Sequence, residues 1–287
     1  MIADHDTNTI YFSDLLRTDP RFTASCEAIL PILSRHQVDY RFLPATRDIW
    51  ARDYMPIQVA EHKWVEYRFD PDYLQDAEKD LRKLKTYPDL VCQRLGLSTG
   101  KTDLILDGGN VIRSRNSVIM TDKVLLENKP THAPEAVKQK LRELFEVENL
   151  VLIPWDPKDF TGHVDGMLRF IDEDAVLVNG IYNAPEHPFC SRLIHSIEEA
   201  GLDIHWLQVS DDEKNTWAYL NFLQTQDLLL VAGLGLPQDE DALAAIKKAF
   251  PEYASRGAVE QVNVERITQA GGALNCVSWP VLESRNA

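Results

Sequence analysis

Short apolar runs alternate with longer amphipathic segments along the whole chain, and this alternation predicts a mixed α/β protein. Runs of four to eight residues rich in β-branched and aromatic side chains, such as residues 9–12 and 150–153, are typical of strands. Segments with apolar side chains every three or four positions are typical of helices. The predicted helices cover residues 20–35, 72–85, 134–145, 188–200 and 240–250.

Pairs of neighbouring strands separated by short turns predict β-hairpins between these helices. The predicted pairs are 49–59 with 63–69, 111–113 with 117–120, 164–171 with 175–178, and 217–223 with 228–232, and a last strand region covers 271–281. The order of strand, hairpin and helix recurs about every 55 residues, which indicates an internal repeat of five units. No composition shift or low-complexity linker separates the units, so we expect residues 1–287 to form a single domain.

A polar residue stands at the start of each predicted hairpin, again about 55 residues from the next. These residues are Asp53, Asp107, His163, Asn221 and Cys276. Equivalent positions in five units around an axis converge on that axis, so we expect these side chains to meet at one central site. Asp165 would point to the same face as His163 if both belong to a strand. Taken alone, His163 could also be a core histidine held by one hydrogen bond.

The composition of the chain limits which binding partners and which cellular compartment are expected. The chain has 45 acidic and 30 basic residues, a formal net charge of −15, which disfavours nucleic acid and anionic membranes and favours a cationic ligand. No apolar run reaches the roughly 18 residues of a membrane span, and residues 1–8 lack the pattern of a signal peptide. The four dispersed cysteines argue against a zinc ribbon and a disulfide scaffold. We therefore expect a cytoplasmic protein.

Cys276 combines two features of a reactive thiol. It follows Gly271-Gly272, and glycines before a nucleophile let backbone and substrate approach closely. Its place in the repeat also brings it near His163, which can stabilise a thiolate or accept the thiol proton. The other cysteines occur in or beside helix patterns and are interpreted as small buried hydrophobic residues: Cys26, Cys92 and Cys190.

Three carboxylates in the same set, Asp53, Asp107 and Asp165, indicate which substrate charge fits. Three negative charges around a nucleophile oppose the oxyanion of acyl transfer, whereas they suit a cation. A guanidinium is a planar cation with five N–H donors, so two Asp side chains could clamp it while a third orients the His. A metal site formed by His163, Asp165 and Asp53 is the alternative.

Five motifs occur in order along residues 46–280: Trp50-Ala51-Arg52-Asp53, Asp107-Gly108-Gly109-Asn110, His163-Val164-Asp165 with Arg169-Phe170, Tyr219-Leu220-Asn221-Phe222, and Gly271-Gly272-Ala273-Leu274-Asn275-Cys276. Together they resemble the agmatine deiminase and bacterial-type peptidylarginine deiminase family of the guanidine-modifying, or pentein, superfamily. The resemblance implies a five-bladed α/β propeller (pentein fold) of pseudo-fivefold ββαβ units. It also implies hydrolysis of a guanidine through a covalent Cys adduct, without a metal or an organic cofactor.

The resemblance implies roles for the residues at matching positions. Cys276 matches the nucleophile, and His163 matches the general acid and base. Asp53 and Asp165 match the carboxylates that bind the guanidinium. Trp50 matches a tryptophan that lines the substrate pocket.

The sequence departs from the family pattern at three places, which bear on the substrate more than on the reaction. Asp107 stands where the family has a Glu that pairs with the His, and its side chain is one methylene shorter. Asn275 replaces a His that often precedes the Cys, and Tyr54-Met55-Pro56 replaces a residue-Gly-Pro sequence. Other matching residues are interpreted as structural: Arg52 and Arg169 as partners of carboxylates, Asn110 and Asn221 as partners of backbone groups, and Gly108 and Gly109 as parts of a tight turn.

These observations predict a Cys-dependent hydrolase of a small cationic guanidino compound. Agmatine ranks first, because an acidic protein disfavours the extra carboxylate of free arginine. Peptidylarginine and free arginine are the alternative substrates, and amidino transfer to an amine is the alternative reaction. A catalytically inactive propeller used for binding is the alternative outside enzymes. A homodimer is left open.

Overall fold

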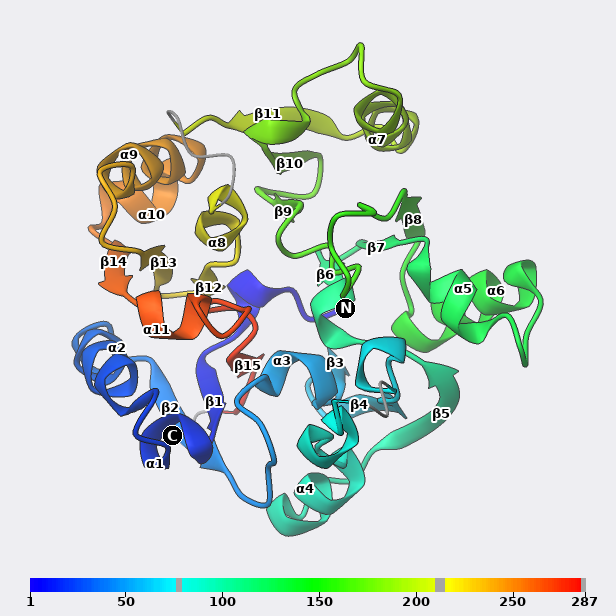
Figure 1. Cartoon of the computed structure of the whole chain (residues 1–287), viewed down its shortest axis with the longest axis horizontal. Helices are drawn as coiled ribbons and strands as arrows, with labels where there is room; N and C mark the ends of the chain where they lie inside the picture. Colours follow the sequence, from blue (N-terminus) through cyan, green and yellow to red (C-terminus); the bar gives the residue numbers. More distant parts are fainter. Residues whose placement is uncertain (76–78, 210–214, 285–287) are drawn as a thin grey trace.

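Five small β-sheets surround a central axis in the computed structural model, which describes residues 1–75, 79–209 and 215–284 (Figure 1). Each sheet is an antiparallel pair followed by a parallel third strand. The sheets are β3 (Ile57–Ala60), β4 (Lys63–Arg68) and β5 (Gly100–Ile105); β6 (Ile112–Arg113), β7 (Ser117–Thr121) and β8 (Asn149–Ile153); β9 (Leu168–Phe170), β10 (Ala175–Asn179) and β11 (Asp203–Leu207); β12 (Leu223–Gln224), β13 (Leu229–Gly233) and β14 (Val259–Asn263); and β15 (Ser278–Val281), β1 (Thr9–Ser13) and β2 (Asp39–Leu43). The predicted five-bladed α/β propeller is confirmed.

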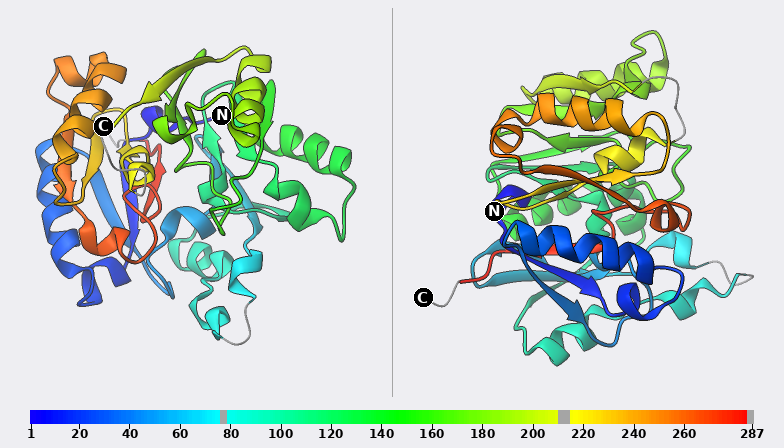
Figure 2. Two further views of the ribbon diagram at one scale, coloured as in Figure 1. Left: turned by 45° about the horizontal axis from the view of Figure 1, so that its top comes forward. Right: turned by 90° about the vertical axis from the view of Figure 1, so that its left-hand side faces the viewer.

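The two ends of the chain build one blade together. Strand β15 pairs antiparallel with β1, with Thr9 opposite Val281 and Phe12 opposite Ser278. Figures 1 and 2 show β15 (red) beside β1 (blue). The ring is therefore closed by main-chain hydrogen bonds between the first and last strands, and the loop before β15 is held at the axis.

A helix lies in the crossover between the parallel strands of each blade, because parallel neighbours cannot be joined by a tight turn. These helices are α2 (Thr23–Arg35), α4 (Pro88–Leu95), α6 (Pro134–Phe145), α7 (Pro188–Glu199) and α9 (Asp239–Ala249), and they lie outside the strands in Figure 1. In α6, Val137, Leu141 and Phe145 recur every four residues and are all fully buried. The amphipathic pattern thus buries one face of each helix against the strands, and α2 and α7 also contact the last strand of a neighbouring blade, β14 and β8.

Several shorter helices connect these elements. They are α1 (Leu15–Thr18), α3 (Ala51–Tyr54), α5 (Lys123–Asn128), α8 (Thr216–Leu220), α10 (Pro251–Ser255) and α11 (Glu265–Thr268). Among the described residues, no helix has the length and apolar character required to span a bilayer.

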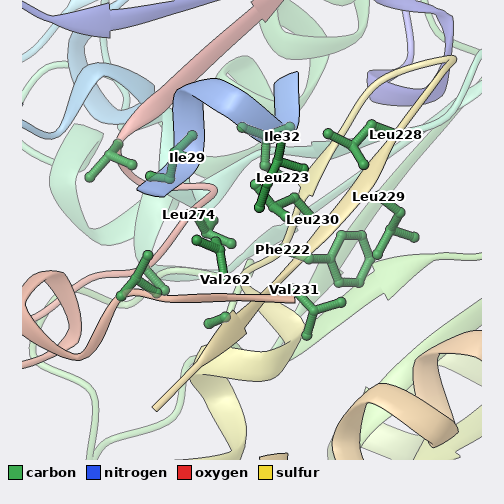
Figure 3. Close-up of a cluster of buried hydrophobic side chains, with 14 of the residues drawn as sticks. Ile29, Ile32, Phe222, Leu223, Leu228, Leu229, Leu230, Val231, Val262 and Leu274 are labelled. Atoms are coloured by element: carbon green, nitrogen blue, oxygen red, sulfur yellow. The ribbon is translucent and has the colours of Figure 1, made fainter. Parts of the chain in front are cut away.

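One hydrophobic cluster packs directly behind the loop that carries Cys276. It joins Ile29 and Ile32 of α2 with Phe222, Leu223 of β12, Leu229, Leu230 and Val231 of β13, and Leu274 (Figure 3). Leu274 is fully buried and lies two residues before Cys276. Close packing of such clusters resists small displacements, so the position of the loop is determined by the core.

The structure corrects the predicted strands at the start of four blades. Residues predicted as strand instead form α3, α8 and the irregular turns that precede β9 and β15. His163 and Asp165 therefore lie before β9, and the prediction that they share a strand face is wrong. All four residues of α3 are buried, so they show no periodic pattern from which a helix could be distinguished from a strand.

The predicted helix over residues 72–85 is also wrong in its described parts. Residues Asp72–Leu74 and Leu81–Leu84 form two separate 3₁₀ turns, and residues 76–78 of the prediction lie outside the described residues. Leu74 is the buried residue of these two turns. Helical propensity alone rarely stabilises a segment that buries so little apolar surface.

Candidate active site

The starts of the five blades meet at the axis, as the repeat predicts. Asp53 lies on α3, Asp107 immediately precedes the 3₁₀ turn Gly108–Asn110, and His163 precedes β9. Asn221 follows α8, and Cys276 precedes β15. All five side chains are buried, and the contacts described below link them into one polar cluster.

Asn221 fixes the position of Cys276. Its Oδ1 atom accepts hydrogen bonds from the backbone N–H groups of Asn275 and Cys276, at 3.1 and 3.2 Å. The Sγ atom of Cys276 lies 3.3 Å from the same oxygen. The prediction that Asn221 satisfies backbone groups is confirmed, and the backbone groups in question are those of the Cys276 loop.

The thiol of Cys276 stands in a negative environment. Its Sγ atom lies 3.8 Å from Oδ2 of Asp165. Burial, reinforced by the charges of Asp165 and Asp53, raises the pKa of Cys276 well above its ordinary value. The site without a ligand therefore holds a thiol, and a bound cation would offset the two charges that oppose the thiolate.

Asp107 reaches His163 despite its shorter side chain. Oδ2 of Asp107 lies 3.0 Å from Nε2 of His163, while Oδ1 accepts a hydrogen bond of 3.2 Å from the backbone N–H of Gly109. The His163 ring packs so closely on Gly109 that a Cβ atom there would lie 2.3 Å from Nδ1. Glycine at this position thus leaves the space that the imidazole occupies.

His163 is held as a cation by its neighbours. Burial lowers its pKa, but the charges of Asp107 and Asp53 outweigh burial and hold the pKa of His163 well above its ordinary value. The ion pair with Asp107 is close in distance, but Nε2 has no well-aligned hydrogen-bond partner among the described residues. An imidazolium of this kind can donate a proton to a leaving group.

Asp53 carries a buried carboxylate oxygen that lacks a partner. Its Oδ1 atom makes no hydrogen bond to any described residue. Burial and the neighbouring charge of Asp107 raise the pKa of Asp53 well above its ordinary value. Leaving such a group unsatisfied is costly, and native proteins rarely do so without a reason. Asp53, Asp107 and His163 also place one donor atom each within 4.8 Å of one another, so this trio could hold a metal ion.

Trp50 and the glycines before Cys276 are in contact. Trp50 is partly buried, and a Cβ atom on Gly272 would lie 2.3 Å from Cζ3 of the indole ring. The space left by Gly272 is thus occupied by the Trp50 ring, and the approach of a substrate past these glycines stays a prediction. Asp165, the second predicted clamp, donates its backbone N–H to the carbonyl of Gly109 at 3.3 Å.

Two residues of the site escaped sequence analysis, Tyr73 and Lys123. The hydroxyl of Tyr73 donates a hydrogen bond to Asp107, and its ring meets that of His163 edge to face at 6.2 Å. Lys123 is buried, and its Nζ atom lies 2.8 Å from both Oδ1 of Asp72 and the carbonyl of Thr161. It thereby ties the Tyr73 turn to the loop that precedes His163. A lysine at the first position of α5, directly before the apolar residues 124–126, is the signal that could have identified it.

A third unpredicted residue, Asp4, organises three buried arginines. Its carboxylate lies 3.4 Å from Arg52, 3.0 Å from Arg113 and 3.2 Å from Arg169. Burial opposes ionisation, but the three guanidinium charges outweigh it and hold the pKa of Asp4 well below its ordinary value. Arg52 and Arg169 therefore pair with a carboxylate, as predicted, and the partner comes from the N-terminal segment. In Figure 1 the N-terminus lies inside the ring of blades.

Comparison with known proteins agrees with this arrangement. A protein of Enterococcus faecalis, provisionally named an agmatine deiminase, is 24% identical over 82% of this chain and 74% of its own length. The agmatine deiminase of Pseudomonas aeruginosa is 23% identical over 61% of this chain and 56% of its own length. The solved structure of C. jejuni agmatine deiminase has a TM-score of 0.75 at 16% identity, covering 99% of this chain and 96% of that chain.

The structural likeness confirms the pentein fold. A separate match to a protein family covers nearly the whole chain. Residues 4–281 match the Porphyromonas-type peptidyl-arginine deiminases. This range contains every residue of the site described above, from Asp4 to Cys276. The chain belongs to the Porphyromonas-type peptidyl-arginine deiminase family.

Proposed function

We propose that the protein is a guanidine deiminase that hydrolyses agmatine to N-carbamoylputrescine and ammonia through a covalent adduct of Cys276. One observation carries the proposal. A buried, unpartnered carboxylate oxygen of Asp53 belongs to the same cluster as the Cys276 thiol and the Asp165 carboxylate. A guanidinium would bring to Asp53 and Asp165 both a positive charge and N–H donors.

Substrate binding would also activate the nucleophile. Asp53 and Asp165 clamp the guanidinium, and Trp50 lines the path to it. The bound positive charge offsets the two carboxylates that raise the pKa of Cys276, so the thiolate forms more readily in the complex than in the free enzyme. The site therefore remains a protonated thiol until a cation binds.

The chemistry proceeds in two halves. The thiolate of Cys276 attacks the guanidinium carbon and forms a C–S bond. His163, paired with Asp107, donates its proton to the leaving nitrogen, the C–N bond breaks, and ammonia departs. His163 then accepts a proton from water, and the resulting hydroxide attacks the adduct carbon. The C–S bond breaks, which releases the ureido product and restores the thiolate.

The candidate substrates share the guanidinium and differ in the charged groups at the other end of the molecule. A net charge of −15 favours the ammonium of agmatine over the carboxylate of free arginine. The three buried arginines near the axis are already engaged, because Asp4 holds all of them. Agmatine therefore ranks first, and peptidylarginine, after which the family is named, ranks second. A reducing, cytoplasmic compartment fits four cysteines that are buried and unpaired.

The test is a comparison of agmatine, free arginine and arginine blocked at both backbone ends, with ureido product and kcat/KM as readouts. We expect agmatine to give the highest kcat/KM, and oxygen from labelled water to enter the product. Label-free product would favour amidino transfer. A Cys276→Ala variant should fold and lose turnover, and a haloacetamidine should label the wild type on Cys276 alone. Full activity of Cys276→Ala would contradict the proposal.

A further inference from the structure

Asn275 links an arginine on one side to the clamp carboxylate on the other. Its Oδ1 atom accepts a hydrogen bond of 2.7 Å from Nη2 of Arg52, and its Nδ2 atom donates one of 2.7 Å to Oδ2 of Asp165. A guanidinium can only donate, and a carboxylate only accepts when ionised. The two neighbours therefore leave a single orientation for the amide.

The oxygen that Asn275 holds is the one beside the nucleophile. Oδ2 of Asp165 lies 3.8 Å from Sγ of Cys276, and Asn275 immediately precedes Cys276 in the chain. Asn275 is 2% exposed, so its amide is shielded from the competing hydrogen bonds of bulk water. A buried hydrogen bond to a charged group is among the stronger hydrogen bonds in proteins, so this contact selects one orientation of the carboxylate.

The other end of this link is equally fixed. The backbone N–H of Arg52 donates to the carbonyl of Cys276 at 3.0 Å, and its guanidinium contacts Asp4. Arg52 precedes the other clamp, Asp53, in the chain. Asn275 thus lies between the segment that carries one clamp and the side chain of the second.

We propose that Asn275 is a positioning residue that aims the carboxylate of Asp165 at the guanidinium of the substrate. The proposal rests on the proposed function, because Asp165 acts there as a clamp. It assigns Asn275 to the strength of cation binding, through Asp165, and not to bond making or breaking. It also accounts for a polar amide at a position that is completely enclosed by the protein.

The test uses Asn275→Asp, which keeps the shape and the acceptor for Arg52 but replaces the donor to Asp165 with a second acceptor. We expect KM for agmatine to rise at least tenfold, while kcat falls less than threefold. In Asn275→Ala, which adds no charge beside the thiol, alkylation of Cys276 by a cationic haloacetamidine should slow by a similar factor, whereas alkylation by neutral iodoacetamide should stay within twofold of the wild type. Asn275→His, which offers one donor and one acceptor, should recover part of the loss in KM.

Asn128→Asp is the matched control, because Asn128 is fully buried and hydrogen-bonds to the backbone of Ile105 and Val124. This control variant should lower the melting temperature, but it should change the rates of Cys276 alkylation by the two reagents to the same extent. If Asn275→Asp unfolds, Asn275→Ala gives the same comparison without adding a carboxylate. Unchanged KM in either folded variant, or equal slowing with both reagents, would overturn the proposal. An inactive wild type would instead reject the proposed function itself.

Discussion

The hydroxyl of Tyr73 donates a hydrogen bond to Oδ2 of Asp107, the same carboxylate oxygen that lies 3.0 Å from Nε2 of His163. Oδ2 of Asp107 thus accepts a hydrogen bond from the phenol of Tyr73 and lies beside the imidazolium of His163. Asp107 is one methylene shorter than the Glu expected from the resemblance, and the tyrosine hydroxyl gives its carboxylate a second fixed contact. The orientation of His163, which we propose as the acid that protonates the leaving nitrogen, therefore depends on a residue outside the five motifs.

Tyr73→Phe should lower kcat for agmatine by about tenfold and change KM little. Loss of a hydrogen bond to a charged group costs about 1.5–3 kcal/mol, and part of it is expected to appear in the step that uses His163. Steady-state kinetics measures the changes in kcat and KM separately. Tyr182→Phe, which removes a similar 2.7 Å bond to Asp156, is the control and should leave both constants near wild type. Equal effects in the two variants would assign Tyr73 to stability alone.

Asp53→Asn should abolish most substrate binding and yet stabilise the fold. The folded protein raises the pKa of Asp53, through burial and Asp107, above the value of about 3.9 in the unfolded chain. The unfolded chain therefore loses its proton more easily, so Asp53 lowers stability at every pH above about 4, and the penalty disappears in acid.

We expect the free energy of unfolding of Asp53→Asn to exceed that of the wild type by about 1–3 kcal/mol at neutral pH, and by little near pH 3. Denaturant unfolding at both pH values measures the difference. The same variant should lose tenfold or more in kcat/KM, because a charged partner of the guanidinium is gone. A destabilised Asp53→Asn at neutral pH would contradict this account of Asp53.

Metal removal should leave turnover unchanged. The proposed chemistry uses the Cys276 thiol and the His163 imidazole, so we expect kcat with EDTA to equal kcat without it. Excess zinc should inhibit in competition with agmatine, because Asp53, Asp107 and His163 place donor atoms within 4.8 Å of one another. Inactivation by EDTA that added metal reverses would favour the metal-site alternative.

The convergence of the blade starts could be predicted because it depends on spacing alone. A repeat of about 55 residues places Asp53, Asp107 and Cys276 at equivalent points of a ring, whatever the local structure there. The local structure itself was misread around these residues. Complete burial removes the alternation that identifies a strand, so the helical turn at Ala51–Tyr54 had no distinguishing pattern.

The contacts of Tyr73 and Asp4 could not be predicted, for a different reason. Asp107 is 34 residues from Tyr73 in the chain, and Arg169 is 165 residues from Asp4. Neither contact follows from a motif or from the repeat, because Asp4 precedes the first strand and Tyr73 lies in the crossover between β4 and β5 of one blade. Only the packed fold brings these side chains to the axis.

Asp4→Asn should strongly destabilise the protein and should do so in a pH-dependent way. Asp4 is the shared carboxylate partner of Arg52, Arg113 and Arg169, and those guanidinium charges hold its pKa below that of the unfolded chain. A depressed pKa in the folded state adds stability above about pH 4, and this stability is lost as pH falls towards the folded pKa. Breaking a buried ion pair typically costs 3–5 kcal/mol.

We therefore expect Asp4→Asn to lower the free energy of unfolding by about 3–5 kcal/mol at neutral pH, and the gap to wild type to narrow in acid. Asp6→Asn is the matched control, since Asp6 pairs with the exposed Arg115 and its loss should cost about 1 kcal/mol or less. Urea unfolding across the pH range measures both variants. Three buried guanidinium groups without a counter-charge should repel one another, so a large cost is expected. A cost for Asp4→Asn as small as that for Asp6→Asn would mean that the arginines are stabilised without Asp4.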